Sequence, residues 1–164
     1  TANLAALLHV HRSSDIGSVK NDELRQSSGP DTENSRPSAP VIVDSALREM
    51  SFGTWEGHTI AELRQRVGAA FIDAENKGLD FQPPGGESPR AAMARIGHWT
   101  ASIAANGQPV VAVSHKATIR ALLALATGWA MMSRPPHKLD WRCLHFFSAH
   151  ADGRVSIDRL NVLL

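Results

Sequence analysis

One histidine lies where this chain could bind an anion. His115 comes soon after residues 110–113, a short run of β-branched and small apolar residues that is long enough for one buried strand. The apolar residues 117–126 follow and predict a helix that ends at Gly128. Ligands of open α/β sheets bind at the carboxyl ends of strands, and the free N–H groups of a helix N-terminus favour anions. His115 is therefore the first candidate for a functional residue, and its expected ligand is an anion.

The composition restricts the class of protein. The chain has 164 residues, of which 43% are hydrophobic and 20% charged, which is typical of one globular domain with a sizeable core. Its net charge of +1 argues against a nucleic-acid surface, and no apolar run approaches the roughly 20 residues that span a bilayer. The single cysteine, Cys143, cannot form an intrachain disulfide, which fits a reducing compartment. We expect a cytoplasmic single domain over residues 1–164 that binds neither nucleic acid nor membrane.

Local patterns in the first part of the chain predict little regular structure. Residues 1–8 look like the end of a helix, and residues 9–15 look like a short strand or loop. Ser, Pro, Asp and Asn are frequent in residues 27–40, which predicts a flexible surface loop. The apolar residues 41–43 are predicted to form a buried strand.

The rest of the chain has clearer signals. Thr59 and Glu62 match a capping box, which predicts a helix that runs to about Asn76. Ser88 predicts the N-cap of a longer helix over residues 89–106. The predicted buried stripe of the first helix is Ile60, Leu63, Val67 and Phe71. An Asp-Gly pair at 152–153 predicts a hairpin turn between two final strands, so the order of elements indicates an α/β class with an antiparallel edge.

Four segments, taken in order, resemble the histidine phosphatase superfamily, which is also called phosphoglycerate-mutase-like. Residues 47–57 are similar to the family segment that carries a catalytic acid, and residues 83–88 are similar to its substrate loop. Residues 111–123 are similar to its second-histidine motif, and residues 13–17 to the loop after its second strand. The resemblance implies a three-layer α/β fold, with a mostly parallel sheet and helices on both faces.

The resemblance also implies a chemistry: phosphomonoester hydrolysis or phosphoryl transfer on a small phosphorylated metabolite, without metal or organic cofactor. A histidine attacks phosphorus, a second histidine and arginines neutralise the phosphoryl oxygens, and a carboxylic acid protonates the leaving oxygen. His115 matches the second histidine, and Glu49 matches the proton donor. Glu87 and Ser88 match the substrate loop, and specificity is expected to come from the loops at 51–58 and 79–88.

The chain departs from the family pattern where the nucleophile is expected. The family's first strand ends in Arg-His-Gly, which occurs nowhere in the 164 residues, and Ser18 stands where the family has a further arginine. His9 to Arg12 fits the family's second strand better, which makes Arg12 a candidate phosphate ligand from that strand. Lys116 replaces a glycine after the second histidine and is either solvated or a replacement ligand. The missing strand would leave a gap beside the strand at His115. Another strand, a rearranged sheet, a partner chain or upstream residues could fill it.

Several functions therefore remain open from the sequence. One possibility is a phosphatase, provided that the missing nucleophile strand is supplied. Another is a catalytically dead or repurposed member of the family that binds an anionic ligand or a protein partner. A third possibility is a structural subunit that completes another chain's sheet, which predicts a homodimer. Each site residue also has a structural alternative. His115 could be a buried structural histidine, Glu49 an exposed ion-pair partner, and Glu87 a carboxylate that bonds loop backbone.

Overall fold

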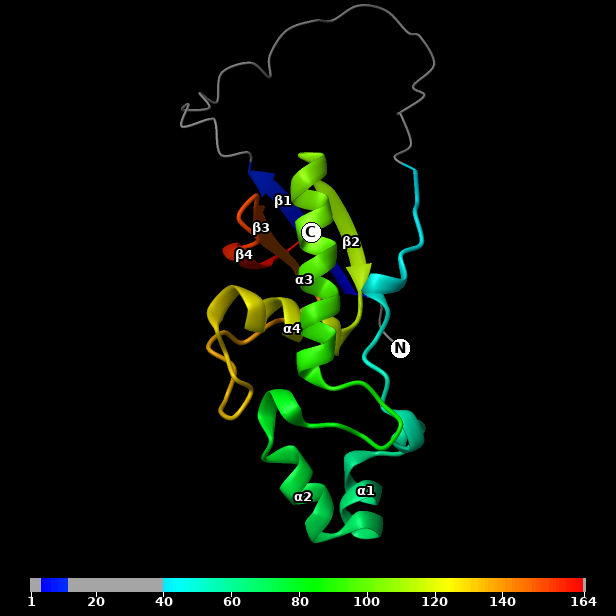
Figure 1. The fold of residues 1–164 in the computed structure, drawn as a ribbon. Coiled ribbons are helices and arrows are strands. Elements are labelled where there is room, and N and C mark those ends of the chain that lie inside the picture. Colours follow the sequence, from blue (N-terminus) through cyan, green and yellow to red (C-terminus); the bar gives the residue numbers. More distant parts are fainter. Residues whose placement is uncertain (1–3, 12–39, 164) are drawn as a thin grey trace, which may run out of the picture.

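The structure, a computed structural model, describes residues 4–11 and 40–163 (Figure 1). Within them, four strands form one sheet in the order β2-β1-β3-β4. The strands are β1 (Leu4–His11), β2 (Val110–Ser114), β3 (Leu144–His150) and β4 (Val155–Val162). β1 pairs antiparallel with β2 and parallel with β3, while β3 pairs antiparallel with β4 through the predicted hairpin.

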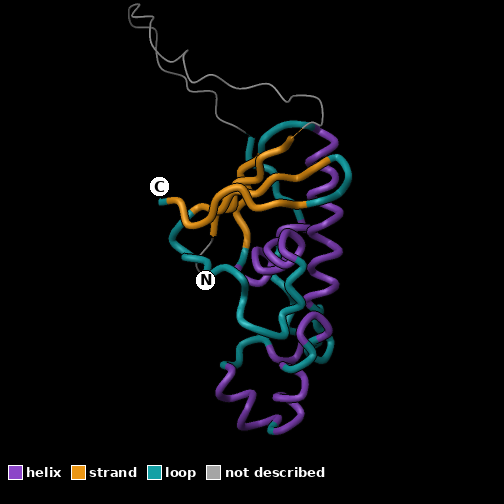
Figure 2. The backbone as a smooth tube through the Cα atoms, turned by 90° about the vertical axis from the view of Figure 1, so that its left-hand side faces the viewer, coloured by secondary structure: helices purple, strands orange, loops and turns teal. Residues whose placement is uncertain are grey.

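Two helices pack on one face of this sheet. α3 (Pro89–Asn106) and α4 (Lys116–Thr127) lie to the same side of the strands (Figures 1 and 2). Buried apolar side chains from both helices meet Ala112 of β2 and Phe147 of β3 in the main core. On the other face of β2, Val111 and Val113 are 65% and 55% exposed. The α/β class is therefore confirmed, but the described sheet is mixed rather than mostly parallel, and described helices cover only one of its faces.

The first strand differs from its prediction. Residues 1–8 were expected to end a helix, but Leu4–His11 forms β1, which lies between β2 and β3. Short apolar runs do not distinguish a strand from a helix by periodicity alone, and two neighbouring strands decide the outcome here. Leu4 pairs with Ser114, so a strand does occupy the place beside the one that leads to His115. The segments at 13–17 and 27–39, with Arg12 and Ser18, lie outside the described residues.

The predicted strand at residues 41–43 is wrong. Val41, Ile42 and Val43 are 94%, 79% and 95% exposed and belong to no strand. A strand needs a neighbour to satisfy its backbone hydrogen bonds, and no described strand pairs with this segment. The apolar composition was therefore insufficient to predict a buried strand.

The predicted helix over residues 59–76 is divided into two. Both capping-box hydrogen bonds of Thr59 and Glu62 are present at the start of α1 (Ile60–Val67). Gly68 has φ +66° and ψ −137°, which ends α1 before α2 (Ala69–Glu75) begins. Of the predicted stripe, Leu63 and Phe71 are buried, whereas Ile60 is 56% exposed because it lies in the first turn. α1 and α2 lie at the end of the molecule away from the sheet (Figure 1).

Short 3-10 helices connect these parts: η1 (Ser45–Leu47), η2 (Gly53–Trp55) and η3 (Gly78–Asp80). Residues 47–57 contain no α-helix or β-strand. Across the described part of the chain, no helix has the length and apolar character needed to cross a membrane.

Candidate functional site

His115 lies at the turn between β2 and α4, where the sequence predicted it. It is the N-cap residue of α4, in an extended conformation (φ −121°, ψ 163°), and it is half-buried. Its side chain makes no capping hydrogen bond to the first turn of α4. Helix N–H groups that lack a cap can donate to a bound anion. The turn therefore combines an imidazole with the positive end of a twelve-residue helix.

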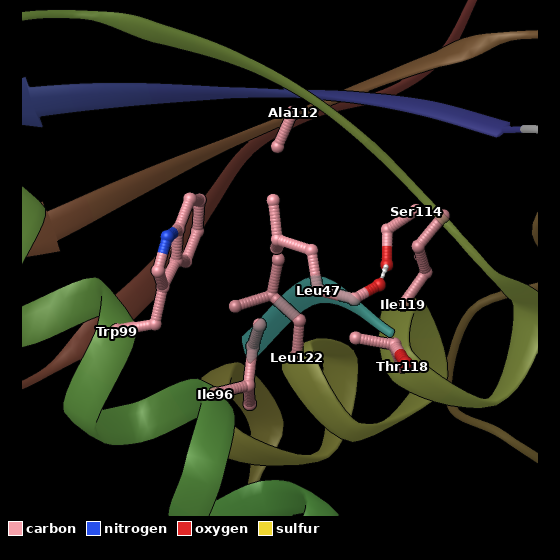
Figure 3. A pocket seen from close by; sticks show the side chains of 8 residues that line it. All are labelled: Leu47, Ile96, Trp99, Ala112, Ser114, Thr118, Ile119 and Leu122. Carbon is pink, nitrogen blue, oxygen red and sulfur yellow. Dashed lines mark hydrogen bonds between the residues drawn. The ribbon is translucent and has the colours of Figure 1, made fainter. Parts of the chain in front are cut away.

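Two buried hydroxyl groups join this turn to the segment that carries Glu49. The Ser114 hydroxyl donates to the Leu47 carbonyl at 2.8 Å, and the Thr118 hydroxyl donates to the Arg48 carbonyl at 2.6 Å. Figure 3 shows Ser114 pointing at the Leu47 backbone. The hydroxyls flank His115 in sequence, and their acceptors immediately precede Glu49. The structure therefore brings the segments of the two predicted catalytic residues together, and their catalytic roles remain predictions.

Thr118→Val is expected to lower the free energy of unfolding by about 1 kcal/mol, because valine keeps the shape but removes the hydrogen bond. The Arg48 carbonyl would then keep only the longer contact from Arg95 Nη1, at 3.3 Å. Thr100→Val is the matched control: Thr100 is equally buried, but its hydroxyl donates to Gly97 within its own helix. Such back-bonding does not stabilise a helix, so this control should be nearly neutral. If urea unfolding shows the same loss of stability for Thr118→Val and Thr100→Val, the role given to Thr118 is wrong.

The carboxylate of Glu49 is half-buried and has little engagement with the rest of the protein. Its Oε1 accepts a hydrogen bond from the backbone N–H of Met50 at 2.9 Å. No salt bridge to Glu49 is found among the described residues. This is compatible with a carboxyl group that exchanges a proton with a ligand, and it does not support the alternative of an ion-pair partner.

Glu87, in contrast, belongs to a largely buried ion pair. Arg95 Nε and Nη2 donate to the two carboxylate oxygens of Glu87 at 3.0 and 2.8 Å, and each side chain is 12% exposed. Arg48 adds a longer contact of 3.6 Å. The Arg95 hydrogen bonds, with the charges of both arginines, hold the pKa of Glu87 below its usual range. Glu87 therefore carries a negative charge at neutral pH that is already matched by protein cations.

Arg95 is the residue of this region that the sequence reasoning missed. Besides Glu87, its guanidinium donates to the carbonyls of Ala46 and Arg48, so it joins α3 to the Glu49 segment. One signal could have identified it: Arg95 follows Ala92 by three residues and directly precedes Ile96, so on a helix it borders the face that these two apolar residues bury. A charged side chain in that position needs a buried partner.

The segment at residues 47–57, here called the acid segment, and the predicted substrate loop at residues 83–88 pack backbone against backbone. The Thr54 N–H donates to the Pro84 carbonyl at 3.0 Å, and the Glu87 N–H donates to the Ser51 carbonyl at 2.8 Å. Gly53, with φ +52°, has no room for a side chain: an added Cβ would lie 2.2 Å from the Pro84 oxygen. The two loops expected to set specificity are therefore held in direct contact.

The other predicted ligands have structural roles or lie elsewhere. The Ser88 hydroxyl accepts from the Ala91 N–H at 3.2 Å as the N-cap of α3, which confirms its predicted cap. Lys116 Nζ lies 5.6 Å from the centre of the Trp141 ring, a cation–π arrangement. Arg12 lies outside the described residues. Phosphate contacts by these three residues remain predictions.

Leu47 and Ser114 are among the residues that line a small void (Figure 3). Its volume is about 10 Å³ and its walls are mainly apolar, with Ile96, Trp99 and Leu122 among them. This is at most the space of one water molecule, so the void is a packing gap rather than a substrate site. The described residues contain no group of three or more His, Cys, Asp or Glu side chains that could hold a metal ion.

Comparisons with known proteins agree with the motifs. The family model described as histidine phosphatase superfamily (branch 1) matches residues 32–162. A 2,3-bisphosphoglycerate-dependent phosphoglycerate mutase of Methylobacterium radiotolerans is 34% identical over 121 residues, which cover 71% of this chain and 57% of that protein. A protein of Mycobacterium tuberculosis described as bifunctional is 34% identical over 130 residues, 74% of this chain and 34% of its own length. The chain thus spans about half or less of these relatives. No solved structure matches it significantly.

Proposed function

This chain belongs to the histidine phosphatase superfamily, and from that premise we propose that it binds the phosphoryl group of a small phosphorylated metabolite at His115, for phosphomonoester hydrolysis or phosphoryl transfer. The observation that carries the proposal is the placement of His115 at the uncapped N-terminus of α4, tied by Ser114 and Thr118 to the segment of Glu49. Similarity to the phosphoglycerate mutase named above supports phosphate chemistry. The substrate in that name belongs to the relative and is not assigned to this chain.

Each group has a distinct part in this proposal. The first N–H groups of α4 and the His115 imidazole would donate to phosphoryl oxygens, where negative charge accumulates. Glu49 would protonate the leaving oxygen, and its carboxyl group forms no salt bridge in the described structure that a ligand would have to displace. Arg95, through Glu87 and the carbonyls of Ala46 and Arg48, would act as a positioning residue for both loops.

The attacking group is the part that this chain does not visibly supply. The 164 residues contain no Arg-His-Gly, and loss of a covalent nucleophile generally costs several orders of magnitude in rate. Lys116 in place of the family's glycine is a second departure. Lys116, together with Ser18 in place of a family arginine, favours an alternative in which the chain binds an anionic ligand without turning it over, because a nucleophile strand supplied from upstream would not explain these two positions.

His115→Ala is expected to weaken the binding of inorganic phosphate at least tenfold, because a hydrogen bond to a charged group contributes about 1.5–3 kcal/mol. Isothermal titration calorimetry on the 164-residue chain measures this directly. His98→Ala is the matched control, since His98 is exposed on α3 and makes no hydrogen bond in the described structure. Equal affinities of the wild type and His115→Ala would overturn the proposal.

Wild type and His115→Ala also distinguish an enzyme from a protein that only binds phosphate. Turnover of an aryl phosphate that is abolished by His115→Ala would support the phosphatase. Phosphate binding without turnover and without an acid-labile phosphohistidine would support the binding alternative.

A further inference from the structure

A second cavity, of about 400 Å³, lies between residues 52–58, α1, α2 and Phe81, which precedes the substrate loop. Its size falls in the usual range of small-molecule sites, about 300–1,000 Å³. The apolar side chains in its wall are those of Phe52, Trp55, Ile60, Leu63, Phe71 and Phe81. The function proposed above makes no use of this cavity, which we name the aromatic cavity.

Aromatic rings form much of this wall. The Trp55 ring lies 5.0 Å from the Phe71 ring and 5.8 Å from the Phe81 ring, centre to centre, with interplanar angles of 51° and 47°. Tilted rings at such distances leave edges and faces open to a further ring, which gains energy beyond the burial of its area. The shape and chemistry of the wall therefore favour a flat apolar group.

The charges around the aromatic cavity disfavour an anion inside it. Among its lining residues, Glu56 and Glu75 are acidic and none is lysine or arginine. The one basic lining residue is His58, whose Nε2 lies 2.6 Å from Arg66 Nη1. Arg64 pairs with Glu75 through contacts of 2.9–3.3 Å, which neutralises that carboxylate. Glu56 accepts hydrogen bonds of 3.1 Å from the Ser51 hydroxyl and the Phe52 N–H, so its charge is partly satisfied by loop groups. An uncharged group fits this environment, whereas a phosphate dianion does not.

The aromatic cavity shares its walls with the two segments of the candidate site. Phe52 follows Glu49 by three residues, and Phe81 lies in the loop that continues to Glu87. The Ser51 carbonyl and the Glu87 N–H join these segments at 2.8 Å. A ligand in the cavity would therefore contact the same two loops that border Glu49 and Glu87.

We propose that the aromatic cavity binds the uncharged aromatic part of an organic phosphate, while its phosphoryl group stays outside, at the His115 site. The first half of this statement stands on the cavity alone. The second half rests on the function proposed above. The substrate class is accordingly an aryl or arylalkyl phosphate rather than a small, fully polar one.

The test uses 1-naphthol, 1-naphthyl phosphate and inorganic phosphate as probes, with calorimetry on the 164-residue chain. Ile60→Trp places a larger side chain at the wall of the cavity, at a position that is 56% exposed. It should weaken the binding of both naphthyl probes at least tenfold and leave phosphate binding unchanged. Ile72→Trp is the matched control, since Ile72 is 51% exposed on α2 and does not line the cavity. It should change none of the three affinities.

The outcomes separate the two proposals. If naphthol does not bind, or if Ile60→Trp leaves naphthol affinity unchanged, the aromatic cavity is not the site and the inference fails. If naphthol binds as expected but His115→Ala leaves phosphate and naphthyl phosphate affinities unchanged, the proposed function fails and the cavity stands. Thermal unfolding checks that Ile60→Trp is folded. Should it not be, Phe52→Leu removes one ring at a half-buried position and should weaken naphthol binding severalfold.

Discussion

Replacing Arg95 with methionine is expected to lower the free energy of unfolding by about 3 kcal/mol, since loss of one partner leaves a buried charge uncompensated. Glu87 would keep only the 3.6 Å contact with Arg48, whose side chain is 54% exposed. The carbonyls of Ala46 and Arg48 would each lose a donor as well. Methionine keeps most of the aliphatic volume, so the loss reports the guanidinium. Urea unfolding followed by circular dichroism measures it.

The matched control is Arg90→Met, on the same helix. Arg90 also binds a carboxylate through two contacts, to Asp80 at 2.6 and 2.9 Å, but its side chain is 61% exposed and that of Asp80 is 64% exposed. Solvent and salt screen exposed ion pairs, so Arg90→Met should lower stability far less than Arg95→Met. Similar losses in the two variants would show that Arg95 has no special part in holding the loops.

The Arg95–Glu87 pair also predicts how stability depends on pH. Hydrogen bonds from Arg95 are the main reason that the pKa of Glu87 is lower than the ordinary 4.5. A carboxyl group with a lower pKa in the folded state contributes stability that is fully present above its unfolded pKa and is lost as pH falls through the folded value. The difference in stability between wild type and Arg95→Met should therefore be full above about pH 4.5 and shrink below it. A difference that stays constant into more acidic solution would contradict this assignment.

Gly53→Ala is expected to destabilise the protein by about 2–4 kcal/mol, through overpacking and left-handed backbone strain together. The added Cβ would lie 2.2 Å from the Pro84 oxygen and 2.6 Å from the Gly86 nitrogen, both backbone atoms that cannot rotate away. The loops at 51–58 and 79–88 would have to separate, which would also weaken naphthol binding in the aromatic cavity. Urea unfolding measures the loss of stability, and calorimetry measures the change in naphthol binding.

Gly85→Ala separates the steric effect from the backbone effect. Gly85 lies in the same loop pair and has φ +70°, but an added Cβ would meet nothing within 4 Å. Only the conformational strain of about 1–2 kcal/mol should then appear, without a change in naphthol affinity. If Gly53→Ala costs no more than Gly85→Ala, the close approach of the two loops does not matter for stability.

Local signals predicted much of the chain correctly. The capping box at Thr59, the Ser88 cap before Pro89 and the hairpin turn at Gly153 are all present. So is the strand–His115–helix turn. Each depends on hydrogen bonds or dihedral angles among residues only a few positions apart, which the sequence displays directly. The family could likewise be identified from short motifs in order, and the match to residues 32–162 confirms it.

Long-range contacts decided the rest. β1 is a strand because β2 and β3 flank it, and residues 41–43 form none because no described strand pairs with them. The bonds that join the Glu49 segment to Ser114 and Thr118 span 67 and 70 residues, so no local pattern could indicate them. Nor did a local pattern indicate that Glu87, whose role in the substrate loop remains a prediction, lies against Arg95. The sequence by itself therefore determined where the histidine turn, the caps and the loops occur. Only the tertiary structure decided which of them meet, because burial and pairing depend on segments that are distant along the chain.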